Sequence, residues 1–341
     1  MYTNQTAEEL ELMRCTSEGI FRAQNSIWLK LNCGVVYLLA FLTFILSYKA
    51  AKFLKDHNVY SHGSQILLFS TLLTANINQA IFLEIKIRQL IHVLTYSNDP
   101  CQIEFHSPDC IYDQTIYSFT NVLSTALGSA LTYSLPTLLS IITTGILNQL
   151  VWLDIYLQVL FSLIIHLYTY AGISRAGYVP SCQYPPQLSL DTFESVNKAT
   201  FWFIMANCLL TIVILLLNIQ KNNKIKISIF VTKVRYNSFE NLLTTKAICS
   251  ISSTQFAFLS LSTAAVSVIS TIEAGISEEV FHLVAQSLTG LVYANLSIPI
   301  LILFKTNKCI EKRRKSIDKM TNNTNEADYY MSSLRASWEK I

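Results

Sequence analysis

The sequence predicts an all-α membrane protein in which seven transmembrane helices form one bundle. Three observations support this prediction: long apolar runs, few charged residues, and an uneven distribution of lysine and arginine. Seven apolar runs of about 18–27 residues alternate with shorter polar segments, and a helix needs about 20 residues to cross a hydrocarbon core of about 30 Å. Such runs are too long for the strands of a membrane barrel. They cover residues 31–48, 65–83, 116–142, 150–171, 200–219, 247–270 and 280–304.

The composition agrees with a bundle embedded in lipid. Hydrophobic residues make up 51% of the 341-residue chain and charged residues 14%, whereas soluble domains contain about 25% charged residues. The mean hydropathy is +0.37. We therefore treat residues 31–304 as one domain, preceded by an N-terminal segment, 1–30, and followed by a basic tail, 305–341.

Lysine and arginine gather on one side of the predicted bundle. If the N-terminus lies outside, the inner segments 49–64, 143–149, 220–246 and 305–341 contain 18 of the 25 basic residues and the outer segments contain 7. The positive-inside rule favours this orientation. Seven spans with an external N-terminus are the topology of a G-protein-coupled receptor. The inverted alternative, a ligand-gated channel or transporter, would place the 18 basic residues outside.

The N-terminal segment, residues 1–30, lacks the apolar region of a cleavable signal peptide. The first apolar run is therefore expected to serve as the signal anchor. Asn4 begins an Asn-Gln-Thr glycosylation sequon, which is usable if this segment reaches the lumen. We expect residues 1–30 to be extracellular and glycosylated.

The second run carries amides at mid-membrane depth and charges near its outer end. At about 1.5 Å per residue, the amides lie about 16–21 Å from the inner face, where we expect interhelical hydrogen bonds. Glu84 and Arg88 are four residues apart and are expected to pair on one helix face. Lys86 is expected to point elsewhere and to reach the lipid headgroups. The amides are Asn76, Asn78 and Gln79.

Three ionisable residues are candidates for ligand binding near the outer mouth of the bundle. Ionisable groups within a membrane often mark functional sites. Glu84 follows the second run directly, His166 lies near the outer end of the fourth, and Glu273 follows the sixth. The alternatives are a self-paired, solvated helix end for Glu84 and an ordinary interfacial position for His166.

Four of the eight cysteines fall in segments predicted to lie outside. An oxidising compartment permits two disulfides among them, with three possible connectivities. Receptors of this topology commonly join the start of the third span to the second outer loop, which would pair Cys110 with Cys182 and leave Cys15 for Cys101. Cys101–Cys182 is the main alternative. Cys309 lies in the basic tail, where it is suited either to S-palmitoylation or to an ordinary free thiol.

Basic residues after the fifth and seventh runs predict contacts with anionic membrane lipid and with a G protein. Polybasic segments are attracted to the inner leaflet by about 1 kcal/mol per residue. Topology and lipid contact explain this charge by themselves, so coupling to a G protein is inferred from the seven-span plan. The residues predicted to face the G protein are Lys233, Arg235, Lys246, Arg313 and Arg314.

The sequence contains no motif for catalysis or for nucleotide or metal binding. HExxH, GxSxG and glycine-rich phosphate loops are absent, and the chain has only 9 glycines. We therefore expect no enzyme activity, no cofactor, no metal and no nucleic-acid partner.

Five stretches that follow one another along the chain carry a resemblance to a known family. They are residues 15–18 (Cys-Thr-Ser-Glu), 74–79 (Thr-Ala-Asn-Ile-Asn-Gln), 98–101 (Asn-Asp-Pro-Cys), 236–247 with 255–256, and 333–339 (Ser-Leu-Arg-Ala-Ser-Trp-Glu). Together they resemble the nematode serpentine receptor class alpha (Sra) chemoreceptors. The resemblance implies a seven-helix olfactory or other chemosensory receptor in the plasma membrane of sensory neurons, coupled to a heterotrimeric G protein.

One stretch departs from the pattern of this family. Many relatives carry an acidic residue followed by arginine near the inner end of the third span, whereas residues 132–136 read Thr-Tyr-Ser-Leu-Pro. The ionic contact between the third and sixth spans is therefore expected to be absent.

The sequence as a whole predicts a chemosensory receptor. A small external ligand is expected to bind among the outer halves of the helices and to shift the bundle between two states. The alternative is the inverted ligand-gated channel or transporter, which an externally accessible C-terminus would support.

Overall fold

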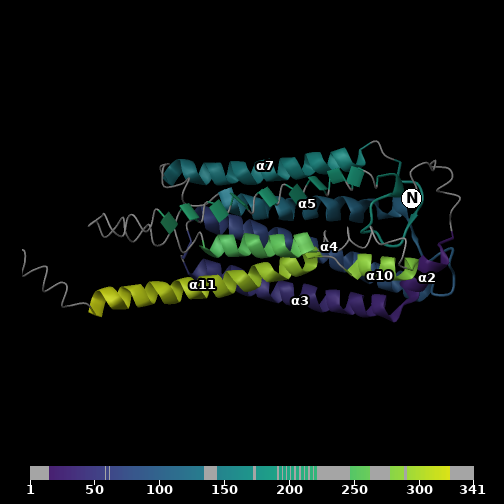
Figure 1. Cartoon of the computed structure of the whole chain (residues 1–341), viewed down its shortest axis with the longest axis horizontal. Coiled ribbons are helices and arrows are strands. Elements are labelled where there is room, and N and C mark those ends of the chain that lie inside the picture. The colour runs from purple at the N-terminus through teal and green to yellow at the C-terminus, as the bar shows by residue number, and fades with distance from the viewer. Residues whose placement is uncertain are drawn as a thin grey trace, which may run out of the picture.

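The structure is a bundle of long helices with a cap of short elements at one end (Figure 1). The computed structural model describes residues 15–57, 59–60, 62–133, 144–171, 174–189, 246–261, 277–287 and 290–322, with separate positions between 192 and 220. Asn4, Lys233, Arg235 and Glu273, which the sequence singled out, lie outside the described residues. So do most of the expected third inner loop and residues 134–136.

Long helices form the bundle, and α4 lies at its centre because it packs against α3, α5, α7 and α11. The bundle consists of α3 (Ile27–Asp56), α4 (His62–Thr95), α5 (Ile111–Tyr133), α7 (Thr144–Tyr170), α11 (Gly290–Asn322) and a helical stretch at 246–261. The cap consists of α2 (Glu18–Asn25), β1 (Phe105–His106), η1 (Ser107–Cys110), β2 (Tyr178–Val179), η2 (Gln187–Ser189) and α10 (Glu278–Ser287).

Large apolar side chains cover the outside of the bundle. On α3, for example, Trp28, Phe41 and Tyr48 are 67%, 62% and 73% exposed. Soluble proteins rarely expose contiguous apolar surface of this extent. Among the described residues, three helical stretches are long and apolar enough to cross a membrane, namely Ile27–Asp56, His62–Thr95 and Glu278–Lys315, and α7 adds a shorter apolar stretch, Ile155–Tyr170.

The predicted runs and the observed helices overlap but have different ends. Runs 31–48, 65–83 and 150–171 lie largely within α3, α4 and α7, and α3 and α4 continue past their runs into the cap and the opposite end. Residues 280–304, expected as one span, contain parts of two elements, α10 and α11. Of the runs at 116–142, 200–219 and 247–270, the structure describes only parts.

Serine side chains start the two helices at the N-terminal side of the cap. The Ser17 hydroxyl oxygen accepts a hydrogen bond from the Ile20 N–H at 3.3 Å, and the Ser26 hydroxyl accepts one from the Trp28 N–H at 3.2 Å. Such caps satisfy amides that have no partner within the helix. Because Ser26 has extended backbone, the chain changes direction between α2 and α3.

Two disulfides tie the cap together. Cys15 is bonded to Cys101, which joins the start of α2 to the loop after α4, and Cys110 is bonded to Cys182, which joins η1 to the loop after β2. Of the connectivities left open by the sequence, the structure contains this one rather than Cys101–Cys182.

A short antiparallel strand pair brings the two disulfide-bonded loops together. Phe105 of β1 lies opposite Val179 of β2, and the Ser107 N–H donates to the Gly177 carbonyl at 2.9 Å. Gly177 has a φ of 96°, a conformation that glycine adopts without the steric cost of a side chain.

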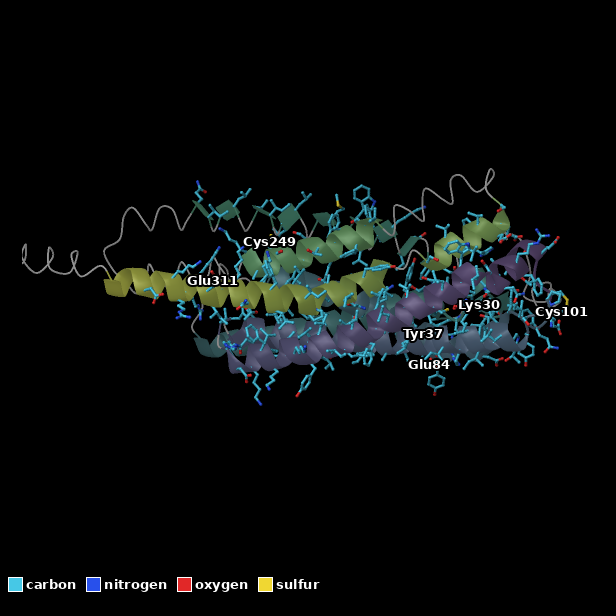
Figure 2. All side chains as sticks on the ribbon, turned by 90° about the horizontal axis from the view of Figure 1, so that it is seen from below. Lys30, Tyr37, Glu84, Cys101, Cys249 and Glu311 are labelled. Carbon is cyan, nitrogen blue, oxygen red and sulfur yellow. A yellow bond between two sulfur atoms is a disulfide. The ribbon has the colours of Figure 1, made fainter. Side chains whose placement is uncertain are left out.

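The opposite end of the bundle, called the tail end below, has an apolar core shared by α3, α4, residues 246–261 and α11. The Thr306 hydroxyl donates to the Tyr60 oxygen at 3.2 Å, and Arg313 Nη2 donates to the Val59 carbonyl at 2.8 Å. These bonds fix the turn between α3 and α4 against α11. Figure 2 shows Cys101 at the cap end and Glu311 at the tail end.

Candidate ligand site at the cap end

A buried lysine lies on the inner face of α4 near the cap. Phe82, Lys86 and Gln89 follow one another at helical spacing on this face, and Lys86 and Gln89 are 0% exposed. Lys86 Nζ donates to Gln89 Oε1 at 3.0 Å and lies 5.4 Å from the centre of the Phe82 ring. The prediction that Lys86 reaches the headgroups is therefore wrong, because its side chain points into the bundle.

Three glutamines connect separate parts of the cap, and one of them, Gln89, contacts this lysine. Gln89 Nε2 faces three acceptors: Gln286 Oε1 at 2.9 Å, Gln24 Oε1 at 3.3 Å and the Pro180 carbonyl at 3.4 Å. Gln24 Nε2 donates to the same Pro180 carbonyl at 3.0 Å. Residues from α2, α4, α10 and the loop after β2 therefore meet at one point. We call Gln24, Lys86, Gln89 and Gln286 the lysine–glutamine cluster.

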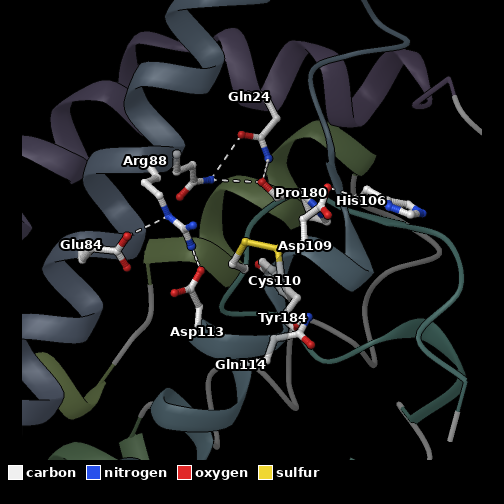
Figure 3. Close-up of a disulfide and its surroundings, with 12 residues drawn as sticks. Gln24, Glu84, Arg88, His106, Asp109, Cys110, Asp113, Gln114, Pro180 and Tyr184 are labelled. Atoms are coloured by element: carbon white, nitrogen blue, oxygen red, sulfur yellow. Dashed lines mark hydrogen bonds and ion pairs between the residues drawn. A yellow bond between two sulfur atoms is a disulfide. The ribbon is translucent and has the colours of Figure 1, made fainter.

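An arginine and two carboxylates lie beside the Cys110–Cys182 disulfide (Figure 3). Arg88 Nε pairs with Glu84 Oε1 at 2.9 Å, as its spacing predicted, and Arg88 Nη2 pairs with Asp113 of α5. The Asp113 side chain is 12% exposed and that of Glu84 52%. Arg88 therefore joins α4 to α5 on the outer side of the helix, away from Lys86.

The charges at the cap end are thus unevenly matched. Arg88 has two carboxylate partners, whereas among the described residues no carboxylate forms an ion pair with Lys86. Its neighbours include an amide oxygen and an aromatic face, which supply partial negative charge only, and the thiol of Cys33 on α3. An anion that entered the cluster would find a full positive charge without a counter-charge.

Below the cluster, amides connect three helices at the middle of the bundle. Asn78 Nδ2 donates to the Thr120 hydroxyl at 2.9 Å, and Asn295 Nδ2 donates to Asn78 Oδ1 at 3.0 Å. The interhelical role predicted for Asn78 is confirmed. Asn76 instead donates to the Leu72 carbonyl of its own helix at 2.6 Å.

Gln79 differs from the other amides. It is 0% exposed, and both polar atoms of its side chain lack a hydrogen-bond partner within the described part of the chain. Buried polar groups without partners are rare and costly. Gln79 precedes Lys86 by seven residues, so the two side chains lie on the same face of α4.

The residues predicted to bind ligand lie apart from the cluster or outside the described residues. Glu84 is on the exposed side of α4, paired with Arg88. His166 of α7 is buried, 5.0 Å from the ring of Tyr170, and its Nδ1 has no hydrogen-bond partner among the described residues. Glu273 is not described. The ligand-binding roles of these three residues remain predictions.

The residues singled out at the tail end differ in exposure. Lys246 and Arg314 are exposed, and Arg313 bonds the Val59 carbonyl. Cys309 is 5% exposed and belongs to the apolar core of this end. Palmitoylation of Cys309 remains a prediction.

Sequence reasoning missed the lysine–glutamine cluster. Residues 24, 89 and 286 are too far apart in the chain for any local pattern to connect them. One signal was present: Lys86 is two residues from both Glu84 and Arg88, which turns it by about 200° from the face on which they pair. That spacing alone does not reveal which face is turned inward.

The apolar exterior, the long apolar helices and the disulfide-tied cap indicate a helical membrane protein. Comparisons with known proteins identify the family. Residues 10–338 match the family described as "Serpentine type 7TM GPCR chemoreceptor Sra". The chain belongs to this family, which is a family of membrane receptors rather than of enzymes.

Relatives from Caenorhabditis elegans match over nearly their whole length. Serpentine receptor class alpha-27 is 62% identical over 341 residues, which cover 99% of each chain. Serpentine receptor class alpha-20 is 31% identical over 98% of this chain and 100% of its own. Serpentine receptor class alpha-17 is also 31% identical, with the same coverage.

Proposed function

We propose that this protein is a chemosensory receptor that binds a small external ligand at the cap end and signals through a heterotrimeric G protein at the tail end. Membership of a chemoreceptor family supports this proposal. The observation that carries it is the lysine–glutamine cluster, a fully buried charge at the point where α2, α4, α10 and the loop after β2 meet. Intramembrane charges of this kind are usually functional.

In this proposal the cap end faces outside and the tail end faces the cytoplasm. Disulfides persist in oxidising compartments, and both described disulfides lie in the cap. The basic residues of α11 beyond Phe304 suit the cytoplasmic side. The family resemblance supports the plasma membrane of sensory neurons as the location, and the sequon at Asn4 supports glycosylation of the external N-terminal segment.

The proposed signal passes along α4 and α11. Separate hydrogen bonds hold the two helices at two levels: Asn295 of α11 bonds Asn78 of α4 in the middle of the bundle, and Thr306 of α11 bonds Tyr60, just before α4, at the tail end. A ligand that binds one arrangement of these helices more tightly shifts the population toward it. His166 and Glu273 are proposed as further ligand contacts. The residues proposed to contact the G protein are Lys233, Arg235, Lys246, Arg313 and Arg314.

Expression of the full chain in heterologous cells tests this function. The cells are exposed to water-soluble and volatile compounds, and intracellular calcium and cAMP are recorded. We expect at least one compound to produce a signal that requires both the receptor and an active G protein. A membrane current that persists when G proteins are blocked would contradict the proposal and support the channel alternative.

A further inference from the structure

Among the described residues, Lys86 has no carboxylate counter-charge. Moving an ammonium group out of water is costly unless an opposite charge and hydrogen bonds replace its hydration. Lys86 has one hydrogen bond, to the neutral Gln89 side chain at 3.0 Å, and one aromatic contact, with Phe82. These contacts compensate only part of the cost, so the site favours an anion.

The nearby carboxylates do not serve Lys86. Glu84 and Asp113 both pair with Arg88, which points away from Lys86 on the same helix. If Lys86 served only to stabilise the cap, we would expect one of these two acids to lie beside it and to neutralise its charge. The chain instead places the Gln89 amide beside Lys86, and an amide can turn either an oxygen or an NH₂ group toward a bound molecule.

A second, independent feature lies further along the same face of α4. Gln79 is fully buried, and neither its oxygen nor its nitrogen has a hydrogen-bond partner among the described residues. Seven residues separate it from Lys86, which corresponds to about 10 Å along the helix. Phe82 lies between them. The face therefore presents a positive charge, an aromatic ring and an amide in succession.

We propose that this face binds a small organic anion whose carboxylate pairs with Lys86. The ring of Phe82 contacts the apolar middle of the ligand, and Gln79 bonds a polar group at its far end. The inference rests on the proposed function, because it takes the cluster to be the receptor's ligand site, and it adds the chemical class of the ligand. Entry requires the contacts of Gln24 and Gln286 with Gln89 to open.

The test uses the purified full-length protein in lipid nanodiscs. The probes are straight-chain carboxylates of graded length, their ω-hydroxy forms and the primary amides of equal length, and the readout is the thermal unfolding midpoint. We expect carboxylates to raise the midpoint and the uncharged amides to have no effect. We expect the ω-hydroxy form to bind more tightly than the plain acid of the same length, and Gln79→Leu to abolish this difference.

Variants of Lys86 separate ligand binding from a structural role. Lys86→Met should weaken carboxylate binding by about thirtyfold or more, because it removes one partner of a buried charge pair, and Lys86→Arg should retain part of the binding. Without probe, Lys86→Met should unfold at the same or a higher temperature than the wild type, since it removes a buried charge. The matched control is Lys30→Met, a lysine of α3 outside the cluster (Figure 2), which should leave carboxylate binding unchanged.

Three results would overturn the inference: no carboxylate stabilises the protein, the amides stabilise it equally, or Lys86→Met lowers the midpoint without probe. Cell signalling distinguishes this failure from failure of the proposed function. Stabilisation by carboxylates without any G-protein signal would contradict the receptor function but would support the anion site. Signals from uncharged compounds that survive Lys86→Met would refute the anion site and keep the receptor function.

Discussion

At the scale of single residues, Glu104 makes the stability of the folded cap depend on pH. Burial raises the pKa of this carboxyl to about 7, the nearby Thr16 hydroxyl lowers it, and the neighbouring Glu278 carboxylate raises it further. The folded protein therefore binds a proton at Glu104 more tightly than the unfolded chain, in which the pKa is near 4.5. The stability that comes from this proton is complete below about pH 4.5 and is lost as the pH rises through about 7.

Substitution of Glu104 by glutamine tests this linkage. Glu104→Gln should raise the free energy of unfolding at about pH 8 by about 1–3 kcal/mol, because the neutral amide avoids burial of a charge. It should also flatten the dependence on pH between about 4.5 and 7. The measurement is the unfolding midpoint across this pH range. Glu18→Gln, which changes an exposed carboxylate of the cap, is the control and should keep the wild-type profile.

The lysine–glutamine cluster shows which features cannot be predicted from local sequence patterns. The pairing of Glu84 with Arg88 could be predicted, because it depends only on helical spacing within one element. The inward orientation of Lys86 could not. It depends on Gln24 and Gln286, which reach the site from α2 and α10, and their positions depend on how the cap folds.

At the scale of elements, Asn78 is the residue through which α4, α5 and α11 are joined. It donates to Thr120 and accepts from Asn295, and all three side chains are buried. Pro299 follows Asn295 by one helical turn inside α11. Proline removes one backbone hydrogen bond and permits bending. The Asn78–Asn295 bond therefore holds α4 against α11 next to the place where α11 bends most easily.

A double-mutant cycle measures the contribution of this bond. We expect Asn78→Ala and Asn295→Ala to show a coupling free energy of about 0.5–2 kcal/mol, as interhelical hydrogen bonds in membrane proteins do. The unfolding free energies of the wild type, the two single variants and the double variant give this value. Asn76 provides the matched control, because its side chain bonds its own helix. A cycle between Asn76→Ala and Asn295→Ala should give no coupling, and equal coupling in both cycles would contradict this role of Asn78.

At the scale of the whole molecule, the two disulfides determine how the cap closes the bundle. Cys15–Cys101 and Cys110–Cys182 join residues 86 and 72 positions apart in the sequence. Loops of this length give the unfolded chain much freedom, which a crosslink removes. The two bridges also position the segments that carry Gln24 and Pro180, so the cap and the lysine–glutamine cluster should form together.

Removal of either bridge should impair folding more than signalling. Cys110→Ser and Cys101→Ser should each lower the free energy of unfolding by about 2–5 kcal/mol and reduce the amount of receptor at the cell surface. The molecules that reach the surface should retain their maximal response. Surface labelling and dose–response curves on the same cells separate the two effects. Cys309→Ala is the control, because it removes a buried thiol at the tail end that forms no bridge.

The general plan of the molecule could be predicted from the sequence, and its details could not. Apolar runs predicted α3, α4 and α7, because lipid requires long apolar helices. The last run covers parts of α10 and α11, and residues 288 and 289 between them lie outside the described residues. The cysteine pattern limited the disulfides to three connectivities, and the arrangement usual in receptors favoured the one that the structure contains, Cys15–Cys101 with Cys110–Cys182.

The predicted orientation in the membrane determines which end of the molecule meets the external ligand and which end meets the G protein. The 18 basic residues on the predicted inner side and the disulfides in the cap both favour an external cap. An epitope at the N-terminus should therefore bind antibody on intact cells, and one at the C-terminus only after permeabilisation. Asn4→Gln should increase electrophoretic mobility, as glycosidase treatment does for the wild type, because Asn4 then lies in the lumen during synthesis. A C-terminal epitope accessible on intact cells would show that the orientation is the opposite one. The lysine–glutamine cluster would then lie on the cytoplasmic side, where it could not bind an external ligand.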